Sequence, residues 1–160
     1  MTIREFTESD ILPALEIWNE IIREGNAFPA IDELTAEEGV RYFKSQSFTG
    51  VGLDDDGNMV AVYILHPNNE GHCGHICNAS YAVKGSCRGQ HLGEHVVRHC
   101  MQKGRELGFE ILQFNAVVAS NERALRLYRR LGFTQLGVIP RGFKKSDGTY
   151  EDIIPHYHPL

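Results

Sequence analysis

The stretch from Val83 to Arg98 constrains the fold most strongly, because a β-like run ends there, a glycine-containing loop follows and a helix opens. Apolar residues continue at helical spacing from Leu92 to Leu107, so one side of this helix is predicted to pack on a core. The first turn of a helix leaves backbone N–H groups without partners and carries the positive end of the helix dipole. The loop glycines allow close approach of a ligand, and Arg88 supplies a donor suited to phosphate. These features predict an anion site where the loop meets the helix.

Two familiar phosphate-binding motifs do not fit this stretch. The Walker loop ends in Gly-Lys-Ser/Thr and the dinucleotide fingerprint reads Gly-x-Gly-x-x-Gly, and neither spacing occurs between Val83 and Arg98. From these residues alone, a plain strand–loop–helix turn remains the alternative to a phosphate site.

Periodicity and turn signals divide the whole chain into strands and helices. The predicted strands cover residues 2–6, 50–53, 59–65, 72–83, 110–118, 134–143 and 150–158, and the last two form a hairpin. The predicted helices cover about 10–24, 36–45, 92–107 and 121–131. This order mixes hairpins with crossover helices, so we expect an α+β fold over residues 1–160, a single domain with a mixed sheet of about seven strands flanked by about four helices.

Composition narrows the class of protein. Hydrophobic residues make up 42% and charged residues 23% of the 160 residues, as in globular chains. The net charge of −5 provides no broad basic field, so nucleic acid is not expected as a partner. No apolar run approaches the roughly 20 residues of a membrane span. The N-terminus lacks an apolar signal segment, so we expect a protein of the cytoplasm that does not bind membranes.

The cysteines do not form a metal-binding pattern. In a chain that is not secreted, four cysteines are expected to be free thiols. The run His72-Cys-Gly-His-Ile-Cys77 resembles a ligand set, with Cys73, His75 and Cys77 on one face if it is a strand. No second cluster completes a tetrahedral zinc site, so we expect no metal.

Two segments carry a family resemblance. Val83-x4-Arg88-Gly-Gln-His-Leu-Gly93 resembles motif A of the GNAT family of N-acetyltransferases, Gln/Arg-x-x-Gly-x-Gly/Ala. The segment from Asn121 to Phe133 resembles motif B of that family, Asn-x-x-Ala-x-x-Leu-Tyr-x-x-x-Gly-Phe. One departure is His91, which stands where motif A usually has its first glycine. Its imidazole must point away from a pyrophosphate or help to bind it.

The resemblance implies acetyl-coenzyme A (acetyl-CoA) as the co-substrate, held between the splayed strands 72–83 and 110–118. It implies backbone contacts just past a bulge in the first of these strands, a pyrophosphate on the amides of the loop, and a pantetheine arm near Asn121. The residues expected to bind acetyl-CoA are Tyr81, Ala82, Val83, Arg88, Gly89, Gln90, His91, Leu92, Gly93, Glu94, Asn115, Asn121 and Tyr128.

Acetyl transfer to an amine requires a proton acceptor, and a donor for the departing thiolate. The phenol of Tyr128, in the motif B segment, is the predicted donor, and the alternative is a half-buried tyrosine with a merely structural hydroxyl. The base is open, because strand 72–83 contains no carboxylate. The candidate bases are His75, His156, Glu24, Glu151 and water.

Asn78 and Asn115 are amides within apolar strands, where unpaired polar groups are costly. The run Cys77-Asn78-Ala-Ser-Tyr81 resembles fungal acetyltransferases that act on azetidine-2-carboxylate, in which the first asparagine handles substrate. The alternative is an amide that satisfies a strand bulge. Phosphinothricin acetyltransferases are the neighbouring resemblance, and in either case Trp18 and Phe28 would form apolar walls of the acceptor site.

We therefore predict an N-acetyltransferase that acts by direct attack of a small-molecule amine, such as an amino acid or analogue, with Tyr128 and Asn78 as catalytic residues. A protein or peptide N-acetyltransferase is the alternative within the class. A non-catalytic coenzyme A (CoA)-binding sensor is the alternative outside it. The sequence is also compatible with a homodimer.

Overall fold

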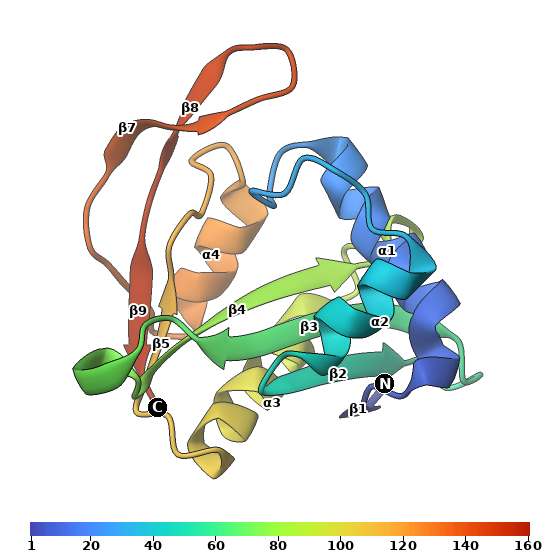
Figure 1. Cartoon of the computed structure of the whole chain (residues 1–160). Helices are drawn as coiled ribbons and strands as arrows, with labels where there is room; N and C mark the ends of the chain where they lie inside the picture. Colours follow the sequence, from blue (N-terminus) through green and yellow to red (C-terminus); the bar gives the residue numbers. More distant parts are fainter.

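The computed structural model describes all 160 residues and contains a seven-stranded mixed sheet (Figure 1). Its order is β1 (Thr2–Glu5), β2 (Phe48–Leu53), β3 (Met59–Pro67), β4 (Ile76–Val83), β5 (Ile111–Phe114), β9 (His156–Pro159) and β6 (Thr134–Gln135). β4 and β5 are parallel, whereas all other neighbours in this sheet are antiparallel. This arrangement confirms the predicted α+β class and the mixed sheet.

Two pairs of helices cover the two faces of the sheet (Figure 1). On one face, α1 (Ile11–Glu24) and α2 (Ala36–Lys44) bury an apolar cluster that includes Trp18 and Phe43. On the other face, α3 (Leu92–Glu106) and α4 (Glu122–Arg130) pack on a cluster that includes Tyr63 and Phe114. The four predicted helices are confirmed, and the alternation of side chains along each strand supplies both clusters.

Local signals explain where the helices begin and end. Thr35 caps α2, because its Oγ1 accepts from the Glu38 N–H at 3.3 Å and the Glu38 carboxylate accepts from the Thr35 N–H at 2.9 Å. Gly25 ends α1 in the left-handed conformation, with φ at 63°, which glycine adopts without steric cost.

The sheet splits between β4 and β5. The two strands pair only at Ile76–Ile111 and Cys77–Leu112, and beyond these pairs they diverge (Figure 1). β4 instead continues beside β3 as far as Val83, with no shift in register along the pairing. The prediction of a bulge in this strand is therefore wrong. The sheet opens only because β4 and β5 diverge.

Several predicted boundaries are wrong. Residues 71–73 form a 3₁₀ turn, so β4 begins only at Ile76 and the predicted shared face of Cys73 and Cys77 does not exist. The predicted final hairpin is divided between two sheets. Only β7 (Ile139–Lys144) and β8 (Tyr150–Ile153) form a ribbon, which projects from the body (Figure 1), whereas β6 and β9 join the main sheet.

All four cysteines are free thiols in the structure. Cys77 and Cys100 are buried, and the Cys77 thiol donates to the Ile111 carbonyl at 3.2 Å. No group of three or more His, Cys, Asp or Glu side chains is placed to hold a metal ion. None of the helices has the length and apolar character needed to cross a membrane.

Candidate active site

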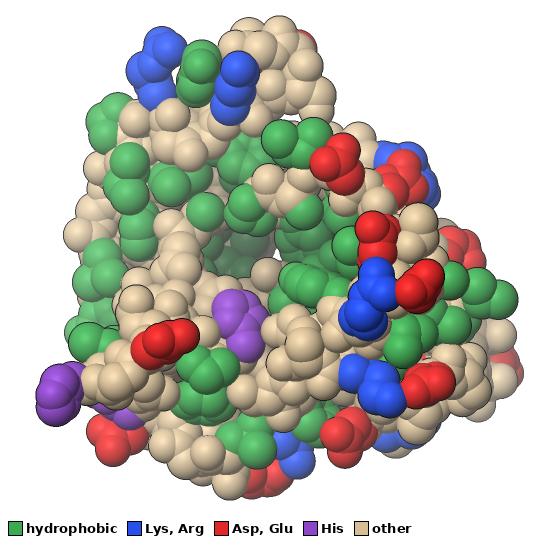
Figure 2. All heavy atoms as spheres, in the orientation of Figure 1, with side chains coloured by type: hydrophobic (Ala, Val, Ile, Leu, Met, Phe, Trp, Pro, Cys, Tyr) green, Lys and Arg blue, Asp and Glu red, His purple; other side chains and the backbone are tan.

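Two adjoining cavities occupy the split between β4 and β5. The larger, of about 750 Å³, lies among the end of β4, the loop before α3, and the helices α3 and α4. The smaller, of about 180 Å³, lies between β4, β5 and the loop after α1. Tyr81, Asn121 and Tyr128 line both cavities, so the two spaces meet at these side chains. Figure 2 shows a hollow lined largely by apolar side chains on this side of the molecule.

The loop before α3 presents a run of free backbone donors. No carbonyl or side chain of the protein accepts a hydrogen bond from the N–H groups of residues 89–93. Gly89 and His91 have positive φ values of 90° and 60°, and alternation of this kind turns successive N–H groups toward one point. Such a nest at the start of a 15-residue helix is suited to a phosphate.

His91 occupies a backbone conformation that favours glycine. It is the N-cap of α3, with φ at 60° and ψ at 10°, in the left-handed region. This geometry explains why motif A has glycine at the same place. The exposed His91 side chain lines the larger cavity.

Arg88 lies at the same end of the larger cavity. Its Nη1 forms an ion pair with Glu24 Oε1 of α1 at 2.7 Å, and its Nε donates to the Val83 carbonyl at 3.4 Å. Its Nη2 is buried and has no hydrogen-bond partner. A buried donor without an acceptor costs free energy, so this nitrogen is available to an anionic ligand.

Three arginines of α4 add positive charge to the larger cavity, and the sequence prediction missed them. Arg123, Arg126 and Arg130 all line this cavity. Arg130 donates to Glu94 Oε2 at 2.6 Å and so ties α4 to the first turn of α3. Arg98 and Arg130 together lower the pKa of Glu94. Their spacing of three and four residues, which puts them on one helix face, was the signal available in the sequence.

Alternation along β4 decides which backbone groups face the split. Lys84 N–H donates to the Val60 carbonyl at 2.9 Å, and the regular pairing with β3 continues from this bond. The backbone groups of residues 79, 81 and 83 therefore point away from β3, toward the split. The backbone of Ala82 instead pairs with β3, and neither Ala82 nor Gln90 lines a cavity.

Tyr128 stands where the two cavities meet. Its ring packs on Phe114 and Phe133, with centroids 4.5 and 5.4 Å away. Burial raises the pKa of the phenol above its ordinary value, and the nearby Cys100 thiol contributes to the rise. The hydroxyl makes no hydrogen bond within the chain. A neutral phenol with its proton available is suited to protonate a leaving group.

The smaller cavity has amide and apolar walls. Asn78 Nδ2 donates to the Gln113 carbonyl at 2.8 Å, so this amide bridges β4 and β5 where they separate. Asn115 also lines this cavity rather than the larger one, and its amide bonds to Asn68 at 2.7 Å. Asn121 caps α4, with its Oδ1 accepting from the Ala124 N–H at 3.2 Å, and its Nδ2 makes no hydrogen bond within the chain.

The two predicted aromatic walls have different positions. Phe28, from the loop after α1, lines the smaller cavity. Trp18 is only 3% exposed and lines neither cavity, but its ring packs on Phe28 at 4.5 Å. Trp18 therefore acts on this space only by supporting Phe28.

The candidate bases do not converge on the smaller cavity. Glu24 lines the larger cavity but is paired with Arg88. Burial lowers the pKa of His156, and its Nδ1 donates to the Ile154 carbonyl at 2.7 Å. His75, His156 and Glu151 line neither cavity.

Ten of the residues expected to bind the co-substrate come together around the larger cavity. They are Tyr81, Val83, Arg88, Gly89, His91, Leu92, Gly93, Glu94, Asn121 and Tyr128.

Comparisons with known proteins agree with this geometry. The model of the Acetyltransferase (GNAT) family matches residues 14–133. N-acetyltransferase aca1 of Schizosaccharomyces pombe is 31% identical over 108 residues, which are 66% of this chain and 52% of that protein. The chain thus spans about half the length of this curated relative.

Solved structures share the whole fold. A GCN5-related N-acetyltransferase from Kribbella flavida superposes with a TM-score of 0.90 at 29% identity, over 99% of this chain and 97% of that chain. A phosphinothricin acetyltransferase of the GNAT superfamily from Sinorhizobium meliloti was solved in complex with acetyl-CoA. It superposes with a TM-score of 0.91 at 20% identity, over 99% of this chain and 88% of that chain.

Proposed function

The chain belongs to the acetyltransferase (GNAT) family, and from this premise we propose that it transfers the acetyl group of acetyl-CoA to a small-molecule amine by direct attack. The observation that carries the proposal is the junction at Tyr128, where a large cavity with a phosphate nest opens into a small neutral one. This arrangement matches a long anionic donor on one side of a reacting centre and a compact acceptor on the other.

The residues of the larger cavity fit acetyl-CoA. The free N–H groups of residues 89–93 would hold the pyrophosphate, and the unpartnered Nη2 of Arg88 would add a charged donor. The edge of β4 at Tyr81 and Val83 offers backbone groups to an amide-containing arm, as does the free Nδ2 of Asn121. Bound there, acetyl-CoA supplies an activated acyl group as its thioester.

The acceptor would lie in the smaller cavity. Its volume of about 180 Å³ is small beside the 750 Å³ of the larger cavity, which favours a compact amine over a peptide. No Asp, Glu, Lys, Arg or His lines this cavity, so the amine would meet amides and apolar side chains. Asn78 Oδ1 makes no hydrogen bond within the chain and can accept from the amine N–H, which would orient the nitrogen.

Tyr128 would act as the general acid. Burial keeps its phenol protonated, and its place in the lining of both cavities supports a position of the hydroxyl near the reacting thioester. The phenol would give its proton to the departing thiolate and regain one from water.

An amine panel tests the proposal. The purified protein is incubated with acetyl-CoA and single amines, which include α-amino acids, cyclic secondary amines, polyamines and an alanine-terminated peptide, and both free thiol and acetylated product are measured. We expect product with compact amines and none with the peptide. Turnover only with the peptide would overturn the small-molecule acceptor, and tight CoA binding with no product from any amine would identify a sensor.

A further inference from the structure

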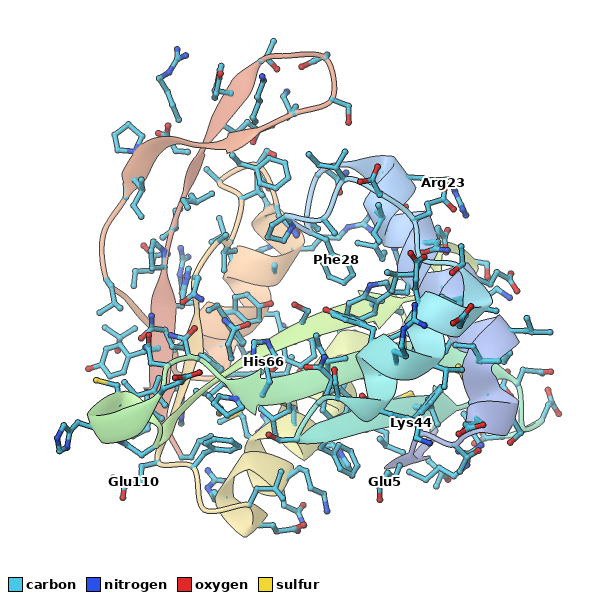
Figure 3. The ribbon with its side chains drawn as sticks, viewed as in Figure 1. Glu5, Arg23, Phe28, Lys44, His66 and Glu110 are labelled. Atoms are coloured by element: carbon cyan, nitrogen blue, oxygen red, sulfur yellow. The ribbon has the colours of Figure 1, made fainter.

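His66 lies on β3, next to the strand β4 that lines the smaller cavity. It lies near the end of β3 and is paired directly with Asn78 of β4. Side chains of directly opposed residues in an antiparallel pair lie on one face, with Cβ atoms about 5 Å apart. His66 is not itself a lining residue, but its side chain lies on the same face of the sheet as Asn78, which lines the cavity. Figure 3 shows His66 on the sheet, below Phe28 in this view.

One hydrogen bond fixes the tautomer of this ring. His66 Nδ1 lies 2.9 Å from the carbonyl oxygen of Pro67. A carbonyl can only accept, so Nδ1 carries the proton and the neutral ring keeps its lone pair on Nε2. No group of the protein bonds to Nε2, so this nitrogen is free to accept a proton.

The surroundings of His66 are almost free of charge. The neighbouring strands present Thr49 on β2, Asn78 and Ser80 on β4, and Gln113 on β5. The titratable groups that line the smaller cavity are the phenols of Tyr81 on β4 and Tyr128 on α4. Beyond them, the larger cavity is lined by Glu24, Cys87, Arg88, His91, Glu94, Arg123, Arg126 and Arg130. Glu24 is paired with Arg88, and the cations of α2 are paired with carboxylates, Arg41 with Glu37 and Lys44 with Glu8.

We propose that His66 is the general base on the acceptor side, a role that rests on the proposed acetyl transfer. The amine nitrogen forms a bond to the acetyl carbon as the carbon–sulfur bond breaks. The amine N–H proton passes to His66 Nε2, directly or through one water molecule, and the Tyr128 hydroxyl gives its proton to the sulfur. The proton on the imidazolium then returns through solvent to the phenolate, so both residues regain their starting state.

The test compares His66→Gln with His72→Gln, which changes an exposed histidine in the turn of the same β3–β4 hairpin. His66→Gln should lower kcat by about 10²-fold or more and leave the Kd of acetyl-CoA unchanged. The pH profile of kcat/KM for the amine should lose the acidic limb that a histidine base produces. Added imidazole should restore part of the activity of His66→Ala, and His72→Gln should behave as the wild type.

A second measurement does not depend on turnover. Nitrogen-15 spectra of labelled histidine, assigned with the His66→Gln variant, should show the proton of the neutral His66 ring on Nδ1. A proton on Nε2 would overturn the proposal, as would an active wild type whose His66→Gln variant keeps its kcat and its acidic limb. A wild type inactive on every amine would instead overturn the proposed function, and the base role with it.

Discussion

At the scale of single residues, Arg88 is already paired with a carboxylate, because its Nη1 lies 2.7 Å from Glu24 Oε1. A phosphate bound by Arg88 would compete with Glu24 for the guanidinium. Arg88→Ala should weaken acetyl-CoA binding by about 10- to 100-fold, the range of a lost charged hydrogen bond. The same substitution should weaken the binding of S-acetylpantetheine, which lacks the nucleotide, much less. Titration calorimetry with both ligands measures the difference, and Arg105→Ala, an exposed position of α3, is the control. Equal losses for both ligands would remove Arg88 from the pyrophosphate site.

A substitution at His91 tests the backbone conformation of the phosphate nest. Because a left-handed conformation costs an L-residue roughly 1–2 kcal/mol, His91→Gly should raise the free energy of unfolding by up to about 1 kcal/mol. The affinity for acetyl-CoA should hold or improve. The matched control is His95→Gly, an exposed position within α3, which should instead lower the free energy of unfolding by roughly 0.3–0.5 kcal/mol. Denaturant titration measures both, and a large loss of CoA affinity in His91→Gly would make the imidazole a ligand.

The roles proposed for Tyr128 and Asn78 predict different changes in the steady-state kinetics of their variants. Tyr128→Phe should lower kcat by about 10²–10⁴-fold on every amine, because the leaving group is always CoA. Asn78→Ala should raise the KM of the acceptor, to a degree that varies among amines, and leave the Kd of acetyl-CoA nearly unchanged. Tyr150→Phe, on the projecting ribbon, is the control. A normal kcat in Tyr128→Phe would end the general-acid assignment.

The site residues that the sequence predicts are those carried by a local motif. The glycines and Arg88 of the nest follow from a strand–loop–helix pattern, and Tyr128 follows from the resemblance to motif B. The sequence does not point to His66, because the role that we propose for it depends on the pairing of β3 with β4, which sets Asn78 opposite it. Register between strands depends on the whole sheet, and one sequence does not display it.

At the scale of elements, the misplaced final hairpin has a physical cause. Pro155, which has no backbone N–H, lies two residues past the end of β8 and directly before β9, so the predicted strand 150–158 is interrupted there. Gly137, with φ at 138°, lies between β6 and β7 and interrupts the predicted strand 134–143. Apolar periodicity continues across both breaks, which is why the pattern alone predicted two long strands.

The start of α1 offers an element-level prediction. The carboxylate of Asp10 bonds to Arg4 at 2.7 Å and accepts from the Thr7 N–H at 2.8 Å, so it joins β1 to the helix. These bonds, led by the one with Arg4, lower the pKa of Asp10 from 3.8 to about 2. At 1.36 kcal/mol per pKa unit this corresponds to roughly 2 kcal/mol, and solvent screening of Arg4 reduces it.

Asp10→Asn should therefore lower the free energy of unfolding at pH 7 by about 1–2 kcal/mol. Because the folded pKa is depressed, this stabilisation is complete above the unfolded pKa of about 3.9 and is lost as the pH falls toward 2. The difference between variant and wild type should thus shrink between pH 4 and pH 2 in denaturant titrations. Asp56→Asn, in an exposed turn, controls for the change in net charge. A constant difference at all pH values would contradict the ion-pair explanation.

At the scale of the whole molecule, the sheet is divided between β4 and β5, and we call this line of division the seam. Two residue pairs, the bond from the Cys77 thiol to the Ile111 carbonyl and the bond from Asn78 to Gln113 join β4 to β5. Glu94 and Arg130 join α3 to α4. Groups that would hold acetyl-CoA lie on both sides of this seam, at residues 89–93 and on α4. A ligand bound there should therefore stabilise the two halves against separation as well as the loop itself.

Coenzyme A tests this whole-molecule effect. A ligand present at 100 times its Kd stabilises the native state by about 2.7 kcal/mol, and Tm should rise accordingly. Hydrogen exchange should slow in the loop before α3 and equally in α4 and β5, because the ligand spans the seam. Adenosine 3′,5′-bisphosphate, which carries only the nucleotide end, should protect the loop but leave exchange in β5 nearly unchanged. Protection confined to the loop with intact CoA would mean that the ligand does not bridge the halves, and would move the pantetheine arm out of the split.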